Sequence, residues 1–500
     1  MMARVLSSPR PGLMGRVGRI GWAAASLLVI AVLSGCEVGP DYKAPKTELA
    51  PFHNISTAGA QLNGTAPSLD RWWTGFNDPA LEKVVSRALA QNLDLAAAFA
   101  RVRQARAAAG GAEADLFPTV DADATATGEN ISERGPLGSI LKDQPGFHRD
   151  QQEYTFGPMA SWEIDLFGGL RRASAAARAE AEAAEAEQLA TRIIVAADAA
   201  DAYIQIRGLQ ARLAVAMDQI DTDTHLLKIV HIRFDAGQAN DREIAQAEAL
   251  LNQAQATVPN LRIALEAQLN RLDVLMGAQP GTYAHEFAVP AAIPSIPPIG
   301  NDNAPVDVLR RRPDVIAAER RLAASNEDIG AAISDYYPKI SISGALGFDS
   351  LSISHLFSAK AFQPIGTGAI RWRLFDFGKV EAEVAQAKGA KAEALTKYRQ
   401  SVLKAAEDVE NALMSLVQGQ THVEDLQREV DSFTRSRDLS QRAYEAGAIA
   451  LTDVLDANRE LLSARDELDL TRTDAARAAV STFRALGGGW DSSPQMQARK

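Results

Sequence analysis

Phe234-Asp-Ala-Gly237 returns 210 residues later as Tyr444-Glu-Ala-Gly447. In each copy a long segment rich in Ala, Glu, Arg and Gln leads up to the glycine, and another leads away from it. An aromatic residue, an acid, Ala and Gly are typical of a helix end at which the chain turns back. We predict that the chain contains two copies of one unit, and that these two turns are the tips of its helical hairpins.

Further landmarks repeat in the same order, first at an offset of 220 residues and then at an offset of 210. These pairs are Asp94 and Asp314, Phe117 and Tyr337, Trp162 and Trp372, and Gly168 and Gly378. The ten-residue difference falls between two strand-like runs, where a loop tolerates insertions. Ordered matches of this kind indicate an internal duplication.

Each repeat is predicted to hold a leading helix, two strands, a very long helix and a shorter return helix. In the first repeat these are helix over 79–114, strands over 119–127 and 154–166, helix over 170–234 and helix over 241–276, with a loop over 128–153. At 1.5 Å per residue the long helix would span roughly 100 Å and the return helix roughly 55 Å. A leading helix stacked end to end on a return helix would therefore match the long helix.

The strand-like runs alternate between bulky and polar residues. Over 154–166 the aromatic residues Tyr154, Phe156 and Trp162 share one face, while polar residues share the other. Aromatics near both ends of such a strand are typical of a membrane barrel, although a soluble hairpin with one wet face would also alternate. Four strands cannot close a barrel in lipid, where open edges are not tolerated, so two, three or more copies must assemble.

Composition excludes several classes of function. Hydrophobic residues make up 46% of the 500 residues and aromatics only 6%, which favours close packing of Ala-rich helices. The net charge of −11 argues against a nucleic-acid partner, and a single cysteine excludes internal disulfides. No Gly-x-Ser-x-Gly elbow, His-Glu-x-x-His motif, phosphate-binding loop or histidine ligand cluster is present. We therefore expect no enzyme, no metal and no cofactor besides a covalent lipid.

That lipid is predicted from the N-terminus, residues 1–35. Four arginines precede an apolar run over 20–33 that ends in Leu33-Ser-Gly-Cys36, which resembles a bacterial lipoprotein signal cleaved before Cys36. Several acyl chains on Cys36 would anchor the protein stably. The alternative is a plain secretory signal with a chance cysteine. Cleavage would remove the four arginines and no acids, taking the net charge from −11 to −15 (−11 minus 4).

Several motifs together carry a family resemblance over nearly the whole mature chain. They are the lipobox with Gly39-Pro-Asp-Tyr42, Trp72-Trp73, Trp162 with Phe167-Gly168, Arg311-Arg-Pro-Asp314, and Tyr444 with Gly447 followed by Asp453-Val-Leu-Asp456-Ala457. As an ordered set they resemble the TolC-type outer membrane factor family. Its OprM- and NodT-like branch consists of outer membrane efflux lipoproteins that serve RND-type tripartite pumps.

The resemblance implies a mainly α fold with a membrane β-barrel contribution. Long antiparallel helices would form an α-barrel in the periplasm, and four strands per chain would complete a 12-stranded β-barrel in a homotrimer. The implied divisions are a signal peptide (1–35), a lipid-anchored extended arm (36–78), repeat 1 (79–279), an equatorial linker (280–310), repeat 2 (311–487) and a tail (488–500). The protein would be lipid-anchored and barrel-inserted in the outer membrane, extending into the periplasm.

The function implied by the resemblance is an exit duct for small toxic compounds or drugs. They would pass from an inner-membrane RND-type pump through a periplasmic adaptor into the channel, and then to the exterior. A related alternative is a duct for type I protein secretion. A different class is a lipid-anchored periplasmic coiled-coil scaffold without a pore.

By resemblance, Thr452, Asp453 and Asp456 at the start of the second return helix are assigned to a periplasmic gate. Three copies would place their carboxylates in rings that repel one another and attract cations. The alternative is that the acids cap free N–H groups and complement the helix dipole. The matching residues of repeat 1 are Glu243 and Gln246, so the halves are not equivalent.

The remaining site predictions concern the tips and the tryptophans. Phe234, Gly237, Tyr444 and Gly447 are expected to contact adaptor hairpins, because exposed aromatics would lie beside the turns. The alternative for Gly237 and Gly447 is a simple left-handed helix cap. Trp162 and Trp372 are expected to be membrane-interface anchors or belt packing.

Overall fold

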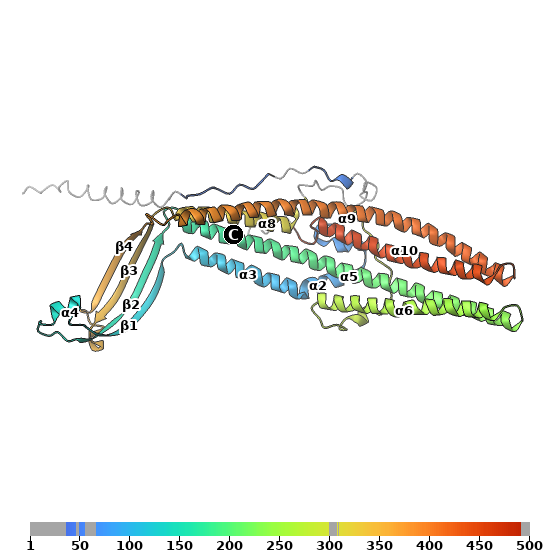
Figure 1. The fold of residues 1–500 in the computed structure, drawn as a ribbon, viewed down its shortest axis with the longest axis horizontal. Helices are drawn as coiled ribbons and strands as arrows, with labels where there is room; N and C mark the ends of the chain where they lie inside the picture. The colour runs from blue at the N-terminus through green and yellow to red at the C-terminus, as the bar shows by residue number, and fades with distance from the viewer. Residues whose placement is uncertain (1–36, 47–49, 56–66, 300–307, 309, 492–500) are drawn as a thin grey trace, which may run out of the picture. The chain divides into compact units, whose positions relative to one another are not determined.

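The computed structural model describes residues 37–46, 50–55, 67–299, 308 and 310–491. The chain is mainly helical, with four strands in one sheet (Figure 1). The α-helices are α2 (Pro79–Gln91), α3 (Leu93–Ala114), α4 (Pro136–Leu141), α5 (Gly169–Asp235), α6 (Asp241–Leu275), α8 (Pro313–Ser334), α9 (Lys379–Glu445) and α10 (Leu451–Ala485). The strands are β1 (Thr119–Asn130), β2 (Asp150–Ile164), β3 (Lys339–Ser350) and β4 (Phe362–Arg371). Short 3-10 helices are η1 (His53–Ile55), η2 (Leu69–Phe76), η3 (Ala284–Phe287) and η4 (Ile353–His355).

The predicted duplication is confirmed element by element. Helices α5 and α9 both have 67 residues, α6 and α10 both have 35, and α3 and α8 both have 22. The ten-residue difference lies in the strand connections, where the first repeat contains α4 and the second contains η4. The predicted signal sequence and Cys36 lie outside the described residues.

Two predicted boundaries are wrong. The leading helix over 79–114 is broken at Asn92, which has an extended backbone and caps α3 by accepting a hydrogen bond from the Leu95 amide at 2.9 Å. The loop predicted over 128–153 is shorter, because β1 continues to Asn130 and β2 begins at Asp150. No glycine or proline lies near Asn92, so the local sequence gave no sign of the first break. Polar residues at the ends of β1 and β2 resemble loop, which hid the true strand ends.

The sheet is antiparallel throughout, in the order β1-β2-β3-β4 (Figure 1). Thr119 lies opposite Ser161 across β1 and β2, and Ser161 lies opposite Ser343 across β2 and β3. Lys339 lies opposite Arg371 across β3 and β4. The first and last strands are therefore the two edges of this sheet.

The chain divides into two compact units, and each contains parts of both repeats. The first unit holds residues 37–44, 105–181 and 321–395, which include the sheet. The second holds the rest of the described chain, including both helical hairpins. Within the described ranges, no helix combines the length and apolar character that crossing a bilayer requires.

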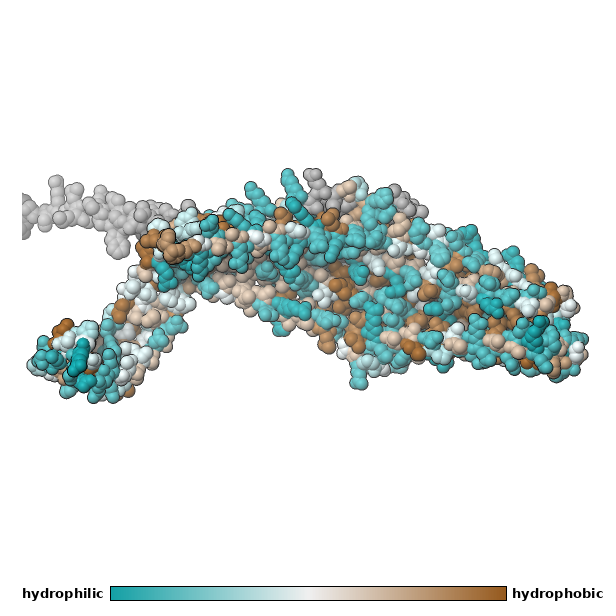
Figure 2. Space-filling model, in the orientation of Figure 1, coloured by the Kyte–Doolittle hydropathy of each residue, from teal (hydrophilic) through white to brown (hydrophobic). Residues whose placement is uncertain are grey.

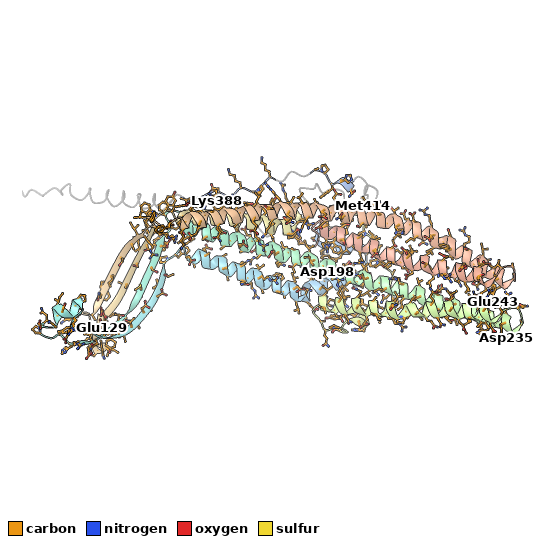
Figure 3. All side chains as sticks on the ribbon, in the orientation of Figure 1. Glu129, Asp198, Asp235, Glu243, Lys388 and Met414 are labelled. Atoms are coloured by element: carbon orange, nitrogen blue, oxygen red, sulfur yellow. The ribbon has the colours of Figure 1, made fainter. Side chains whose placement is uncertain are left out.

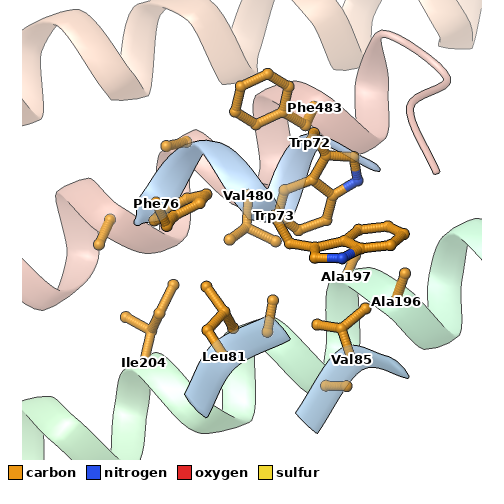
Figure 4. Close-up of a cluster of buried hydrophobic side chains, with 14 of the residues drawn as sticks. Trp72, Trp73, Phe76, Leu81, Val85, Ala196, Ala197, Ile204, Val480 and Phe483 are labelled. Carbon is orange, nitrogen blue, oxygen red and sulfur yellow. The ribbon is translucent and has the colours of Figure 1, made fainter. Parts of the chain in front are cut away.

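The main core of the second unit is built around Trp72 and Trp73. Trp72 stacks on Phe483, with ring centroids 5.4 Å apart, and α2 and α5 contribute Leu81 and Ile204 beneath (Figure 4). Asp78 caps α2, accepting hydrogen bonds from the Ala80 and Leu81 amides. The core therefore fastens the arm segment before α2 onto the long helices.

The predicted end-to-end meeting of leading and return helices is also found. The Asn92 amide donates to the carbonyl of Leu275, the last residue of α6, at 3.0 Å. In the second repeat the Arg312 guanidinium donates to the carbonyl of Ala485, the last residue of α10, at 3.3 Å. Both junctions supply donors to helix-end carbonyls that would otherwise lack partners.

Candidate functional site at the hairpin tips

The two predicted tips are turns of identical hydrogen-bonding pattern. In the first, the Gly237 amide donates to the Phe234 carbonyl and the Gln238 amide to the Arg233 carbonyl, at 2.9 and 2.8 Å. In the second, Gly447 and Ala448 make the equivalent bonds, both at 2.8 Å. Gly237 and Gly447 have φ of +66° and +76°. Both glycines are therefore left-handed helix caps of the Schellman type.

These caps leave the tips sterically open. A methyl group built on either Gly237 or Gly447 would meet no atom within 4 Å, so only the backbone conformation requires glycine. The prediction that the two glycines also contact an adaptor stays a prediction.

The expectation that both tip aromatics are exposed is wrong for Tyr444. Its side chain is 2% exposed and packs in a cluster with Leu226 and Val230 of α5. The Arg233 guanidinium lies over the Tyr444 ring, 4.4 Å from its centroid, and donates a hydrogen bond to the Tyr444 carbonyl. Burial raises the pKa of the Tyr444 phenol. One arginine thus joins the end of the first hairpin to the end of the second.

The matching aromatic of the first tip has a different environment. Phe234 is 38% exposed. After the turn, Asn240 is the N-cap of α6: its side chain accepts a hydrogen bond from the Glu243 amide at 3.2 Å and donates one to the Glu243 carboxylate at 3.0 Å. Figure 3 labels Asp235 and Glu243 on either side of this turn. Glu243 is therefore already used to complete the helix end.

The acids of the second tip are free of that task. Ala450 occupies the cap position of α10 and provides no side-chain acceptor. Thr452, Asp453 and Asp456 are all exposed, and among the described residues the only ion pair shown for these acids joins Asp456 to Arg459 at 3.0 Å. The acids therefore do not act as side-chain caps of α10. An effect on the helix dipole remains, because Asp453 lies in the first turn.

A buried acid lies farther along α5 and was missed from the sequence. Asp223 is 1% exposed, accepts one hydrogen bond from Gln219 at 2.8 Å, and has a second oxygen without a hydrogen-bond partner. Burial raises its pKa to about 6. An aspartate in an Ala-rich helix is normally expected to face solvent. The burial of Asp223 could have been predicted only by working out which face of α5 is buried.

The predicted tryptophans occupy equivalent positions in the first unit. The Trp162 indole donates to the Leu116 carbonyl at 2.9 Å, and the Trp372 indole donates to the Tyr336 carbonyl at 3.0 Å. Each therefore ties the base of a strand to the end of the helix that leads into the sheet. An aromatic cluster lies at the opposite strand ends, where Phe357 packs edge-on against Phe156 and Phe348, and Phe348 packs against Phe362. Phe357 was not predicted from the sequence.

The described residues contain no group of three or more His, Cys, Asp or Glu side chains arranged to hold a metal ion.

Comparison with known proteins covers both repeats. The sequence pattern of the family described as "Outer membrane efflux protein" matches residues 84–278 and 304–488. The pyoverdine export outer membrane protein OpmQ of Pseudomonas aeruginosa is 31% identical, over 87% of this chain and 90% of its own. Nodulation protein T of Rhizobium leguminosarum bv. trifolii is 29% identical, over 92% of this chain and 96% of its own.

Solved structures give the same result for the fold. The outer-membrane channel OprN has a TM-score of 0.83 and 34% identity, covering 91% of this chain and all of that one. The open-state MtrE outer membrane channel of Neisseria gonorrhoeae has a TM-score of 0.78 and 26% identity, covering 92% of this chain and all of that one. With its duplicated hairpins and four strands, this chain belongs to the outer membrane efflux protein family, the TolC-type channels, and is not an enzyme.

Proposed function

We propose that the protein is the outer-membrane exit duct of a tripartite efflux system for small organic compounds. The observation that carries this function is a family match that runs through both repeats, from the leading helices to the return helices. Relatives of nearly equal length include the solvent efflux pump protein SrpC and the toluene efflux pump protein TtgI, both of Pseudomonas putida. The solvent and toluene for which these relatives are named favour small molecules over secreted proteins as cargo.

The duct would be a homotrimer anchored by lipid at Cys36. Three copies of a four-stranded sheet would supply 12 strands, a number within the range of closed membrane barrels. Closure would also cover the two free edges that β1 and β4 present in the single chain. The lipoprotein assignment rests on the sequence before Cys36.

Thr452, Asp453 and Asp456 would form the gate. Their exposure, and the lack of a capping role for the acids, support this assignment over the alternative of simple helix capping. Around a threefold axis the carboxylates would lie close enough to repel one another and to concentrate cations.

A periplasmic adaptor would dock on the tips and connect them to an inner-membrane RND-type pump. The exposed ring of Phe234 and the open space over Gly237 and Gly447 support docking there. Tyr444 would contribute indirectly, because its buried ring fixes the second turn against Arg233.

Single-channel recording in planar bilayers tests this function. The detergent-extracted parent should conduct, and trivalent cations added on the side of the tips should block it. Asp453→Ala combined with Asp456→Ala should raise the half-blocking concentration roughly tenfold, because two rings of charge are lost. Asp241→Ala combined with Glu248→Ala, exposed acids of the first return helix, is the control.

The outcomes separate the duct from its gate. A parent protein without conductance would refute the duct and favour a scaffold without a pore. Conductance with unchanged block in the Asp453 and Asp456 variant would leave the duct standing and refute the acidic gate.

A further inference from the structure

The two edges of the sheet carry opposite charges in matching spacing. β1 presents Asp121 and Asp123, while Arg371 ends β4 and Arg373 follows two residues later. All four residues are exposed. Residues two apart in a strand share a face, so β1 offers two like charges on one side of the sheet. Arg373 lies beyond the end of β4, where it contacts Asp335 and Glu383 at 3.9 and 3.6 Å. It would share the face of Arg371 once the strand extended to it.

The internal duplication defines how strands pair. Thr119 lies opposite Ser161 in the first hairpin, and Lys339 lies opposite Arg371 in the second. Adding 220 to Thr119 gives Lys339, and adding 210 to Ser161 gives Arg371, so the first pair corresponds to the second. These are the offsets that relate the two repeats, so both hairpins have one register.

The pairing of β2 with β3 joins the two repeats within one chain. The same offsets predict how β4 of one copy would pair with β1 of the next. Within the chain, Ser161 lies opposite Ser343, and this register places Glu163 opposite Ser341. The counterparts of β2 and β3 are β4 of one copy and β1 of the next. The resulting opposed residues are Arg371 with Asp123 and Arg373 with Asp121.

We propose that β4 of one copy pairs antiparallel with β1 of the next in this register, and that the two arginine–aspartate pairs select it. The proposal rests on the assembly of copies proposed above and specifies its contact. A slip of one residue would put the arginines and aspartates on opposite faces, and a slip of two would leave only one pair matched. The equivalent joint inside the chain has serines and one glutamate, so the paired charges distinguish the two joints.

An aromatic contact at the base of the sheet supports the same pairing. Inside the chain Phe167 stacks on Tyr337, with ring centroids 4.5 Å apart. Their counterparts in the other joint, Phe377 and Phe117, are 91% and 63% exposed. Figure 2 shows hydrophobic side chains gathered where the strands meet the helices. Stacking of Phe377 on Phe117 of the next copy would cover both rings.

The lengths of the strands fit as well. β2, which has a partner on each side, runs to Ile164, whereas β4 ends at Arg371. The counterpart of Ile164 is Leu374, so residues 372–374 lack the partner that holds their equivalents in the sheet. We expect these residues to become strand when the next copy pairs.

A charge swap in the full-length protein tests the pairing. Asp121→Arg with Asp123→Arg, or Arg371→Asp with Arg373→Asp, should lower the fraction of heat-resistant trimers about tenfold or more, since like charges then face one another. The four substitutions together should restore it. Glu129→Arg is the control, because the register places Glu129 opposite Ile365. Loss of trimers in the fourfold variant as well would overturn the charge pairing.

Cysteine crosslinking tests the register without reversing any charge. Ala124→Cys with Ile370→Cys are opposed in the proposed register and should form covalent trimers on oxidation. Ala124→Cys with Gly368→Cys is shifted by two residues and should not. Crosslinking of the shifted pair alone, in a protein that still conducts, would refute the register and leave the duct intact. A parent that neither conducts nor forms trimers would refute the duct and the pairing together.

Discussion

Arg233 is the residue on which the two hairpin tips depend. Its guanidinium lies over the Tyr444 ring and also binds that residue's carbonyl. The counterpart of Arg233 in the second repeat is Ala443, and the counterpart of Tyr444 is the half-exposed Phe234. Only one such link therefore forms per chain, and it crosses from one repeat to the other.

Replacing Arg233 should loosen the tips. Arg233→Met keeps the apolar stem but removes the contact over the ring and the hydrogen bond, which together are worth about 1–2 kcal/mol. We expect a higher open probability in single-channel records. Arg242→Met, an exposed arginine just beyond the first turn, is the control. A lower melting temperature with an unchanged open probability would show that the link serves stability alone.

Asp223 should make stability depend on pH in an unusual direction. Burial raises its pKa to about 6, above the ordinary value near 3.9, so the folded state binds the proton more tightly than the unfolded state. Stability from this residue is therefore present at low pH and is lost as the pH rises from about 4 to 6.

Asp223→Asn removes this dependence. The variant should be more stable than the parent at pH 7.5, by up to about 3 kcal/mol, and equal to it near pH 4. Thermal melting in detergent at both pH values is the measurement, with exposed Asp221→Asn as the control. A gain in stability that is the same at both pH values would contradict titration of Asp223.

Local residue chemistry was predictable where it depends on neighbours in the chain. Asp78 before Pro79 gave the α2 cap, and Gly237 and Gly447 gave the two left-handed turns. The burial of Tyr444 was not predictable, because its partner lies 211 residues away in the sequence. The aromatic-x-Ala-Gly pattern is the same in both repeats, so it does not show that only the aromatic residue of the second tip is covered by an arginine.

At the scale of elements, the segment 37–44 is held against α5 and α8 by one buried arginine. Arg172 is 5% exposed and forms ion pairs with Glu37, Asp41 and Glu327, at 3.1, 3.0 and 2.6 Å. Gly39 has a φ of +99°, and a methyl group there would come within 2.5 Å of the Gly330 Cα. Charge and close backbone approach together fix this segment.

Removing that arginine should release the segment. Arg172→Met leaves Glu37 and Asp41 without their shared partner, so we expect trypsin to cleave after Lys43 about tenfold faster in the folded protein. Limited proteolysis of the detergent-extracted protein measures the rate. Arg178→Met, six residues farther along α5 and largely exposed, is the control. Equal cleavage in both variants would mean that Arg172 does not hold the segment.

Helix and strand types were predictable because their hydrophobic patterns are long, whereas their breaks were not. The junction at Asn92 exists because its side chain serves two helices at once, capping α3 and donating to the end of α6. The second of those contacts is tertiary, so the local sequence reads as one helix through 79–114. The strand alternation was correct, but the polar ends of β1 and β2 were read as loop.

At the scale of the whole molecule, the duplication was the feature most accessible from sequence. Offsets that stay constant over helices and strands require matching elements, and the observed helix lengths agree. The number of copies in the assembly was not predictable in the same way, because the sequence pattern of one chain does not specify how many chains associate. Complementary charges on the two sheet edges specify which strands of neighbouring copies pair. The number of copies is then set by the geometry at which the ring of sheets closes.

Helices α5 and α9 have equal lengths, and so do α6 and α10, which constrains insertions and deletions within them. Deleting one residue from a helix shortens it by 1.5 Å and turns everything beyond the deletion by about 100°. The charged and apolar faces beyond it would then point away from their partners. The two repeats differ by ten residues in the region between their strands, without any such effect on the tips. Changes in chain length can therefore accumulate in the strand connections, while the paired helices keep equal lengths to the residue.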